Sequence, residues 1–76
     1  MYTLVVWNFH RVTTILDLED LFHRFGELWD VRFAKNRKYA LVTFYYQESA
    51  EAALSSNDLW LNGRTLRVKM GEWTVL

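Results

Sequence analysis

The chain has 76 residues, enough for one small domain that buries only about 60–65% of its unfolded surface. Hydrophobic residues make up 51% of it and charged residues 24%, which is too apolar for a disordered segment and too charged for a membrane span. It has no cysteine, which excludes a disulfide framework and a thiolate site, and it has only two histidines. Its nine basic and nine acidic residues give a net charge of zero.

The first part of the chain predicts a strand followed by a helix. Residues 3–8 are β-branched and aromatic without a helical period, which is typical of a strand. Thr14, followed three residues later by Asp17, forms the pattern of a capping box at a helix start. Hydrophobic residues then recur at helical spacing, so we expect a helix over about 15–25. Gly26 is expected to end it in a left-handed conformation.

The rest of the chain predicts two strands, a second helix and a final strand. Residues 28–34 and 39–45 alternate between two kinds of side chain, as strands do when only one face is buried. The alanine-rich residues 48–56 favour a helix with a narrow apolar stripe. The Asn-Gly pair at 62–63 predicts a tight hairpin, and residues 65–70 predict the last strand.

This order of elements, βαββαβ, indicates an α+β fold. Short connections and right-handed crossovers place both helices on one face of a four-stranded antiparallel sheet, a ferredoxin-like sandwich whose other face stays open. Residues 1–76 carry no linker, repeat or proline, so we expect one domain. The N-terminus lacks the basic region and cleavage site of a secretory signal, so a nuclear or cytoplasmic location is expected.

Hydrophobic periodicity also predicts which side chains form the core. The expected core residues are Leu18, Leu21, Phe22, Phe25, Val31, Phe33, Ala40, Val42, Phe44, Leu54, Leu66 and Val68. Trp29 and Trp60 are expected to cap this core and support the minor hairpin. Leu16 falls outside the apolar stripe of its helix and is expected to be exposed.

Three segments make the chain resemble the RNA recognition motif family. Residues 37–44 are similar to its octamer motif on the third strand, in which a basic residue and a glycine precede alternating aromatic positions. The matching residues are Arg37, Tyr39, Ala40, Val42 and Phe44. Residues 4–9 resemble the hexamer motif of the first strand, and residues 18–26 resemble the first helix with its terminal Phe-Gly.

The resemblance implies that single-stranded RNA binds the open face of the sheet. In this family two or three rings stack on unpaired bases while nearby cations neutralise phosphates. Here Val5 and Leu41 stand where two of these rings are usual, and Lys38 replaces a glycine. Tyr39 is therefore the one usual ring that remains. Trp7 lies two residues beyond Val5, on the same face, and is the candidate for a second ring.

The predicted RNA-binding residues are Tyr39, Trp7, Val5, Leu41, Arg37, Lys38, Arg32, Arg67 and Lys69. Each has a structural alternative. The cations can decorate a sheet for solubility instead of contacting phosphates. Trp7 can instead be covered by the C-terminal tail, where Trp73 is close in sequence to the last strand.

No motif in the chain indicates catalysis. It has no Gly-rich phosphate loop, no nucleophile with a base at suitable spacing and no paired carboxylates, so we expect neither an enzyme nor a cofactor or metal. The alternative to RNA binding is a protein-interaction or sheet-mediated homodimerising module, because Val5, Leu41 and Trp7 form an apolar patch. Family members that grip a tryptophan-bearing peptide usually show Arg-x-Phe, where this chain has Arg-Thr-Leu at 64–66.

Overall fold

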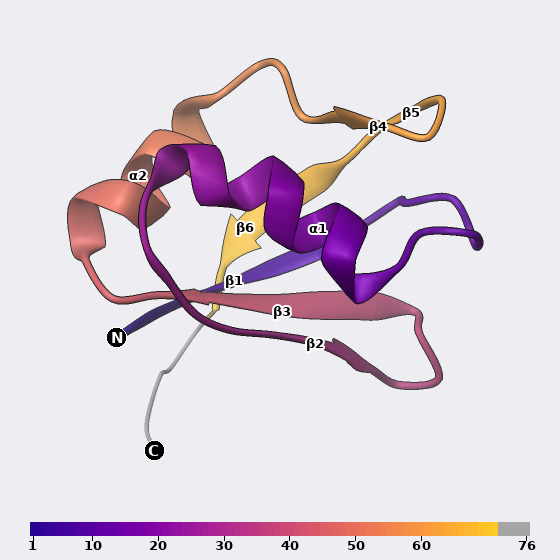
Figure 1. Cartoon of the computed structure of the whole chain (residues 1–76), viewed down its shortest axis with the longest axis horizontal. Helices are drawn as coiled ribbons and strands as arrows, with labels where there is room; N and C mark the ends of the chain where they lie inside the picture. Colours follow the sequence, from indigo (N-terminus) through magenta and orange to yellow (C-terminus); the bar gives the residue numbers. More distant parts are fainter. Residues whose placement is uncertain (72–76) are drawn as a thin grey trace.

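The computed structural model describes residues 1–71, and its two helices lie over the same face of a four-stranded antiparallel sheet (Figure 1). The sheet strands are β1 (Tyr2–Trp7), β2 (Leu28–Ala34), β3 (Tyr39–Phe44) and β6 (Arg67–Met70). Their order across the sheet is β2-β3-β1-β6. The helices are α1 (Ile15–Phe22) and α2 (Gln47–Ser55). The predicted ferredoxin-like α+β fold is confirmed. Within the described part, neither helix is long and apolar enough to cross a membrane.

Strand alternation divides the sheet into a buried face and an open face. The register pairs Leu4 with Val42 and Val6 with Ala40, and all four side chains are fully buried beneath the helices. Eight predicted core residues are buried, namely Leu18, Leu21, Phe22, Val31, Ala40, Val42, Phe44 and Leu66. The other four, Phe25, Phe33, Leu54 and Val68, are partly buried and pack against them. The core also contains Ala50 and Ala53, the apolar stripe predicted for the second helix, and Leu4, Val6 and Leu59, which were not among the predicted core residues.

The capping box predicted at the start of α1 is present. The Thr14 hydroxyl accepts a hydrogen bond from the Asp17 backbone N–H at 3.1 Å, and the Asp17 carboxylate accepts one from the Thr14 backbone N–H at 3.0 Å. This second bond, followed by one from the Asn62 side chain, holds the pKa of Asp17 below its ordinary value. The cap therefore sets where α1 begins and ties that point to a distant hairpin.

The end of α1 differs from the prediction of one helix over 15–25. The α-helix stops at Phe22, and His23–Phe25 form a single 3₁₀ turn, η1. Gly26 follows with φ 152° and ψ −178°, which is not the left-handed helical conformation expected of a helix stop. A β-carbon at Gly26 would collide with the buried side chain of Ser49 in α2. Gly26 is thus required for the close approach of two segments.

A two-stranded hairpin connects α2 to the last strand. Its strands are β4 (Trp60–Leu61) and β5 (Arg64–Thr65), which pair antiparallel. Asn62 and Gly63 form the turn with φ values of 51° and 83°, as the Asn-Gly signal predicts. The final strand begins at Arg67 and not at residue 65, because the Leu66 N–H donates to the Leu59 carbonyl at 2.7 Å. Leu66 thus separates the hairpin from the sheet.

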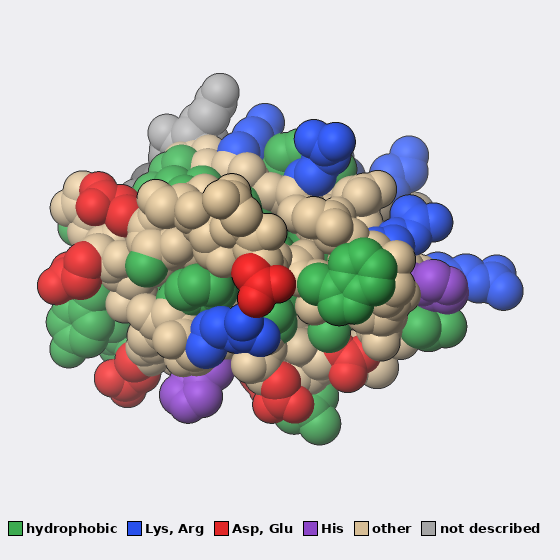
Figure 2. All heavy atoms as spheres, turned by 90° about the horizontal axis from the view of Figure 1, so that it is seen from above, with side chains coloured by type: hydrophobic (Ala, Val, Ile, Leu, Met, Phe, Trp, Pro, Cys, Tyr) green, Lys and Arg blue, Asp and Glu red, His purple; other side chains and the backbone are tan. Residues whose placement is uncertain are grey.

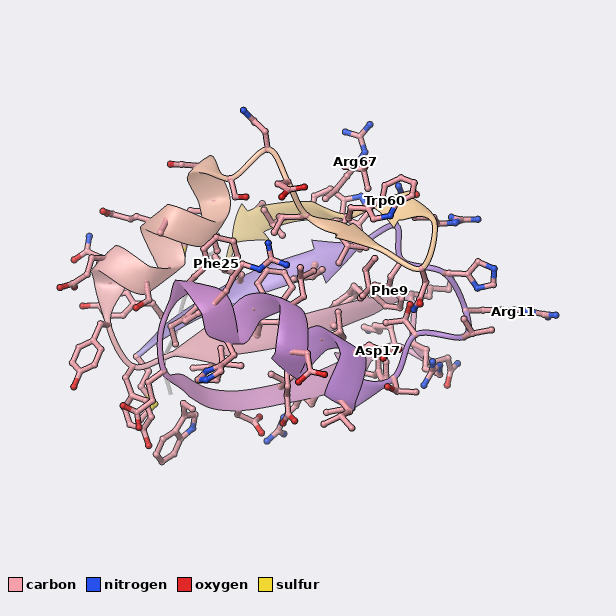
Figure 3. The ribbon with its side chains drawn as sticks, turned by 45° about the horizontal axis from the view of Figure 1, so that its top comes forward. Phe9, Arg11, Asp17, Phe25, Trp60 and Arg67 are labelled. Carbon is pink, nitrogen blue, oxygen red and sulfur yellow. The ribbon has the colours of Figure 1, made fainter. Side chains whose placement is uncertain are left out.

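The expectation that Trp29 and Trp60 cap the core is wrong, since these side chains are 54% and 59% exposed. Trp29 lies at a register shift in the pairing of β2 with β3 and meets Tyr45 edge to face, with the ring centres 5.5 Å apart. Trp60 stands on the small hairpin, outside the main sheet (Figure 3). Leu16 is exposed, as its place outside the apolar stripe predicts.

Candidate nucleic-acid interface

The face of the sheet opposite the helices carries three rows of side chains that run across the strands. The first row contains Ala34, Tyr39, Trp7 and Arg67. The second row contains Arg32, Leu41, Val5 and Lys69. The third row contains Asp30, Thr43 and Thr3. Strand pairing therefore gathers onto one face all the predicted RNA-binding residues except Arg37 and Lys38, which lie in the β2–β3 turn.

The two aromatic residues of this face, Trp7 and Tyr39, belong to adjacent strands at one end of the sheet. The register between β1 and β3 pairs Val6 with Ala40, so one step further Trp7 comes opposite Tyr39. Arg67 pairs with Trp7 from the other side. Both rings are half-buried. Because adjacent strands are about 4.8 Å apart, the two rings are placed to offer neighbouring platforms to two unpaired bases, with a guanidinium beside them.

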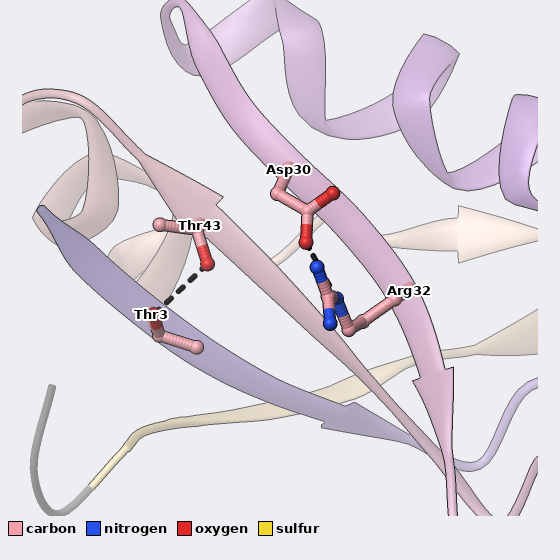
Figure 4. A network of polar contacts seen from close by, with 4 residues as sticks. All are labelled: Thr3, Asp30, Arg32 and Thr43. Atoms are coloured by element: carbon pink, nitrogen blue, oxygen red, sulfur yellow. Dashed lines mark hydrogen bonds and ion pairs between the residues drawn. The ribbon is translucent and has the colours of Figure 1, made fainter. Parts of the chain in front are cut away.

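The centre of the open face is aliphatic. Val5 and Leu41 pair directly across β1 and β3, with Arg32 on the β2 side and Lys69 on the β6 side. The Arg32 side chain is already engaged, because its Nε lies 2.6 Å from a carboxylate oxygen of Asp30 (Figure 4). Lys69 forms no ion pair with any residue of 1–71. The centre thus supplies apolar contact and charge but no stacking ring.

The third row is polar. The hydroxyl oxygens of Thr3 and Thr43 lie 2.9 Å apart and share a hydrogen bond across β1 and β3 (Figure 4). This row carries no ring and its one charge, Asp30, is paired with Arg32. The aromatic character of the open face is therefore concentrated at the end where β1 stops and β3 begins.

Arg37 does not lie with the other predicted residues. Its guanidinium donates hydrogen bonds to the backbone carbonyls of Arg11 at 3.1 Å and Thr13 at 2.5 Å. It also stacks over the ring of Phe33, which points to the helix side of the sheet, with 4.0 Å between the guanidinium carbon and the ring centre. The expectation that Arg37 supplies charge on the open face is therefore corrected, because its side chain binds the β1–α1 loop.

The alternative in which the C-terminal tail covers Trp7 stays a prediction, because Trp73 lies outside the described residues. Among residues 1–71, no cluster of His, Asp and Glu side chains could hold a metal ion.

The structure also shows a hollow that the sequence did not single out. It lies at the end of the molecule where the β1–α1 loop, the β2–β3 turn and the β4–β5 hairpin meet. Its lining residues are Phe9, His10, Arg11, Asn36, Arg37 and Arg64. Arg11 and Arg64 are far apart in the chain and belong to no shared motif, so no local sequence signal could have paired them.

This fold, two helices over one face of a four-stranded antiparallel sheet with aromatic and basic residues on the other face, is that of a small α+β domain. Residues 4–67 match the family model described as the RNA recognition motif. The chain belongs to the RNA recognition motif family and is an RNA-binding module of that family.

A curated relative and several solved structures are similar to the chain. It is 40% identical over 52 residues to the flowering time control protein FPA of Arabidopsis thaliana, a match that covers 68% of this chain and 6% of that protein. The crystal structure of RNA binding protein PG1 superposes with a TM-score of 0.87 at 20% identity, and each chain is covered completely. The penultimate RNA recognition motif of RBM19, described as a hypothetical RNA-binding protein, has a TM-score of 0.83 at 20% identity over all of this chain and 88% of that one. These structural matches support the fold.

Proposed function

We propose that the chain is a non-catalytic module that binds single-stranded RNA on the open face of its sheet, with Tyr39 and Trp7 as the stacking rings. The observation that carries this proposal is the register of β1 against β3, which pairs Val6 with Ala40 and so puts the next residues, Trp7 and Tyr39, on the open face at one end of the sheet, with Arg67 paired to Trp7. Stacking on an aromatic side chain stabilises a bound base by about 1–3 kcal/mol and tolerates any base, because every base has a π-face.

The charges around the rings favour a polyanionic chain. Arg67 lies next to Trp7, and Lys69 lies next to Val5, so both cations line the β6 edge of the face. A phosphate backbone that follows this edge would place its bases over β1 and β3. We infer that bases stack at the Tyr39 and Trp7 end, while the aliphatic centre at Val5 and Leu41 makes weaker apolar contact. Binding by this domain alone is expected to be modest, and linkage to further RNA-binding domains would strengthen it.

The test compares single alanine variants by titration with a mixed-sequence RNA of about four nucleotides. Tyr39→Ala and Trp7→Ala should each weaken binding by about 1–3 kcal/mol. Tyr45→Ala is the matched control, because Tyr45 is an exposed tyrosine just past the opposite end of β3. Unchanged affinity in both ring variants would contradict the proposal.

The alternative function, self-association or protein contact through the apolar patch, gives a different result in solution. Sedimentation over a dilution series should show a monomer if the face is kept for RNA. A concentration-dependent dimer that loses RNA binding as it forms would favour the patch of Val5, Leu41 and Trp7 as a protein interface. We also propose that the protein is intracellular.

A further inference from the structure

The net charge of the chain is zero, but its basic and acidic side chains lie in different parts of the molecule. Six of its nine basic residues lie at one end of the molecule, where β1 stops and β3 and β6 begin. They are Arg11, Lys35, Arg37, Lys38, Arg64 and Arg67. Among the described acids, only Asp17 lies beside the loops of this end, where Thr14 and Asn62 bind its carboxylate. Figure 2 shows the Lys and Arg side chains gathered toward this end and most acids elsewhere.

The three segments of this end, residues 8–14, 35–38 and 62–65, are named the loop end. Side-chain hydrogen bonds tie them together. The Asn62 amide donates to the Thr13 hydroxyl at 3.1 Å, which joins the hairpin to the β1–α1 loop. The Asn8 amide donates to the Thr65 carbonyl at 2.9 Å, which makes a second such link. Arg37 joins the β2–β3 turn to the same loop. The loop end is therefore built as one unit.

The backbone of the loop end is held in an uncommon conformation. Every non-glycine residue with positive φ in the described chain lies here, and three of them are consecutive, with φ of 54°, 58° and 68° at Lys35, Asn36 and Arg37. Such conformations are sparsely populated and persist where surrounding contacts impose them. The cross-links through Arg37 and the two asparagines supply those contacts, so the hollow is a preorganised feature.

Within the hollow, two arginines have no partner among residues 1–71. The guanidiniums of Arg11 and Arg64 form no ion pair there, whereas Arg24 and Arg32 are each paired with an aspartate. Arg11 and Arg64 are both exposed on the lining. Figure 3 shows Arg11 reaching outward at this end, with Phe9 further inside. Because a guanidinium binds phosphate through parallel hydrogen bonds, the exposed Arg11 and Arg64 side chains on the lining of one hollow offer hydrogen-bond donors to an oxyanion.

The hollow lies at the same end of the sheet as Trp7 and Tyr39, with Arg37 of its lining turned to the helix side. Trp7 is followed directly by residues 8–11, and Tyr39 is preceded directly by residues 35–38, so the rings and the loop end share one edge of the sheet. Arg67, beside Trp7, is three residues beyond Arg64. We propose that the hollow is a second binding site for a phosphodiester of the same RNA, with Arg11 and Arg64 holding the backbone after it leaves the Tyr39 and Trp7 platform. This inference rests on the proposed function for the path of the RNA.

The experiment measures the binding of oligouridylates of about four and about ten nucleotides as a function of salt concentration, because only the longer one spans the rings and the hollow. For a single strand, the logarithm of the affinity falls linearly with the logarithm of the salt concentration, and each phosphate contact adds about 0.7 to the steepness of this slope. Arg11→Ala and Arg64→Ala should each weaken the longer RNA by about fivefold at about 0.1 M salt and lower the slope by about 0.7. Binding of the shorter RNA should not change.

Arg24→Ala is the matched control, since it removes one exposed arginine that lies in η1, away from the loop end. It should leave the affinity and the slope for both oligonucleotides as they are. The Arg11 and Arg64 side chains make no hydrogen bond in the described chain, and unfolding midpoints equal to that of the wild type would verify that the variants fold. Arg64→Lys should keep most of the salt slope because it keeps the charge.

The outcomes separate this inference from the proposed function. Unchanged affinity and slope of an Arg11→Ala/Arg64→Ala variant for the longer RNA would overturn the second site, even if Tyr39→Ala weakens both RNAs. If the ring variants have no effect while the double arginine variant still weakens binding of the longer RNA, the second site is supported and the stacking role of Tyr39 and Trp7 is contradicted. Saturable shifts of the loop-end amides with inorganic phosphate at constant ionic strength, without any effect of RNA length, would assign the hollow to free phosphate and overturn its assignment to RNA.

Discussion

The guanidinium carbon of Arg37 lies 4.0 Å from the centre of the Phe33 ring, on the helix side of the sheet. In this position its Nη2 atom reaches the Arg11 and Thr13 carbonyls, so the β2–β3 turn is joined to the β1–α1 loop. A basic residue at the start of the octamer motif thus serves the structure of the loop end, whereas Arg11 and Arg64 form no ion pair within residues 1–71.

Arg37→Ala should therefore lower stability more than it lowers binding at the rings. The loss of two hydrogen bonds from a charged donor should reduce the free energy of unfolding by about 1–3 kcal/mol. Urea denaturation measures this, with Lys35→Ala as the control, because Lys35 lies in the same turn with a similar positive φ. A fully stable Arg37→Ala variant that binds RNA of about four nucleotides less tightly would show instead that Arg37 contacts the ligand at the rings.

A ring restored at the centre of the open face should strengthen RNA binding. Leu41→Phe would place a ring on β3 between Arg32 and Val5, beyond the platform at Tyr39. One additional stacked base is worth about 1–3 kcal/mol, which titration of a short RNA would detect. Leu41→Met adds no ring and is the control. Equal affinities of the two variants would mean that bases do not reach the centre of the face.

Gly26→Ala should destabilise the fold through a specific clash. A β-carbon at Gly26 would meet the Ser49 side chain, and φ of 152° adds backbone strain, so the loss should exceed about 1 kcal/mol. Gly63→Ala separates the two causes, because Gly63 also has positive φ but has open space around it. In a double-mutant cycle with Ser49→Gly, a coupling energy above about 0.5 kcal/mol is expected. Additive effects would contradict the clash.

The carboxylate of Asp17 should make the stability of the chain depend on pH. The Thr14 backbone N–H, and next the Asn62 amide, hold its folded-state pKa below the ordinary value of 3.8. The folded state therefore gains from this group above pH 3.8, and the gain is lost as the pH falls through the lowered folded-state pKa. Unfolding midpoints of wild type and Asp17→Asn should differ at neutral pH and converge in acid.

Asp20→Asn, on the exposed face of the same helix, is the control for that measurement. A difference between wild type and Asp17→Asn that stays constant down to the lowest pH would show that the capping box acts through shape alone and not through charge.

Features of the chain that depend on neighbouring residues could be predicted from the sequence. The capping box at Thr14, the Asn-Gly hairpin and the strand that contains Tyr39 depend on side chains a few residues apart, whose spacing matches the periods of helix and strand. Alternation along β1 and β3 also placed Trp7, Val5 and Leu41 correctly on the open face. The family resemblance rests on the same local patterns.

Features that depend on packing between distant segments could not be predicted. Gly26 lies so close to Ser49 that a β-carbon would not fit, and the start of β6 is set by the hydrogen bond from Leu66 to Leu59. Trp29 turns outward at a register shift, which hydrophobicity alone misplaces in the core.

By itself the sequence determined the order of the elements, the family and the side chains of the open face, because alternation and periodicity are properties of the chain itself. The tertiary structure alone decided that β1 pairs with β3 in the register that sets Val6 opposite Ala40, that Arg37 turns to the loop, and that Arg11 and Arg64 line the same hollow. The physical reason is that strand register and loop contacts bring together residues whose separation along the chain carries no signal.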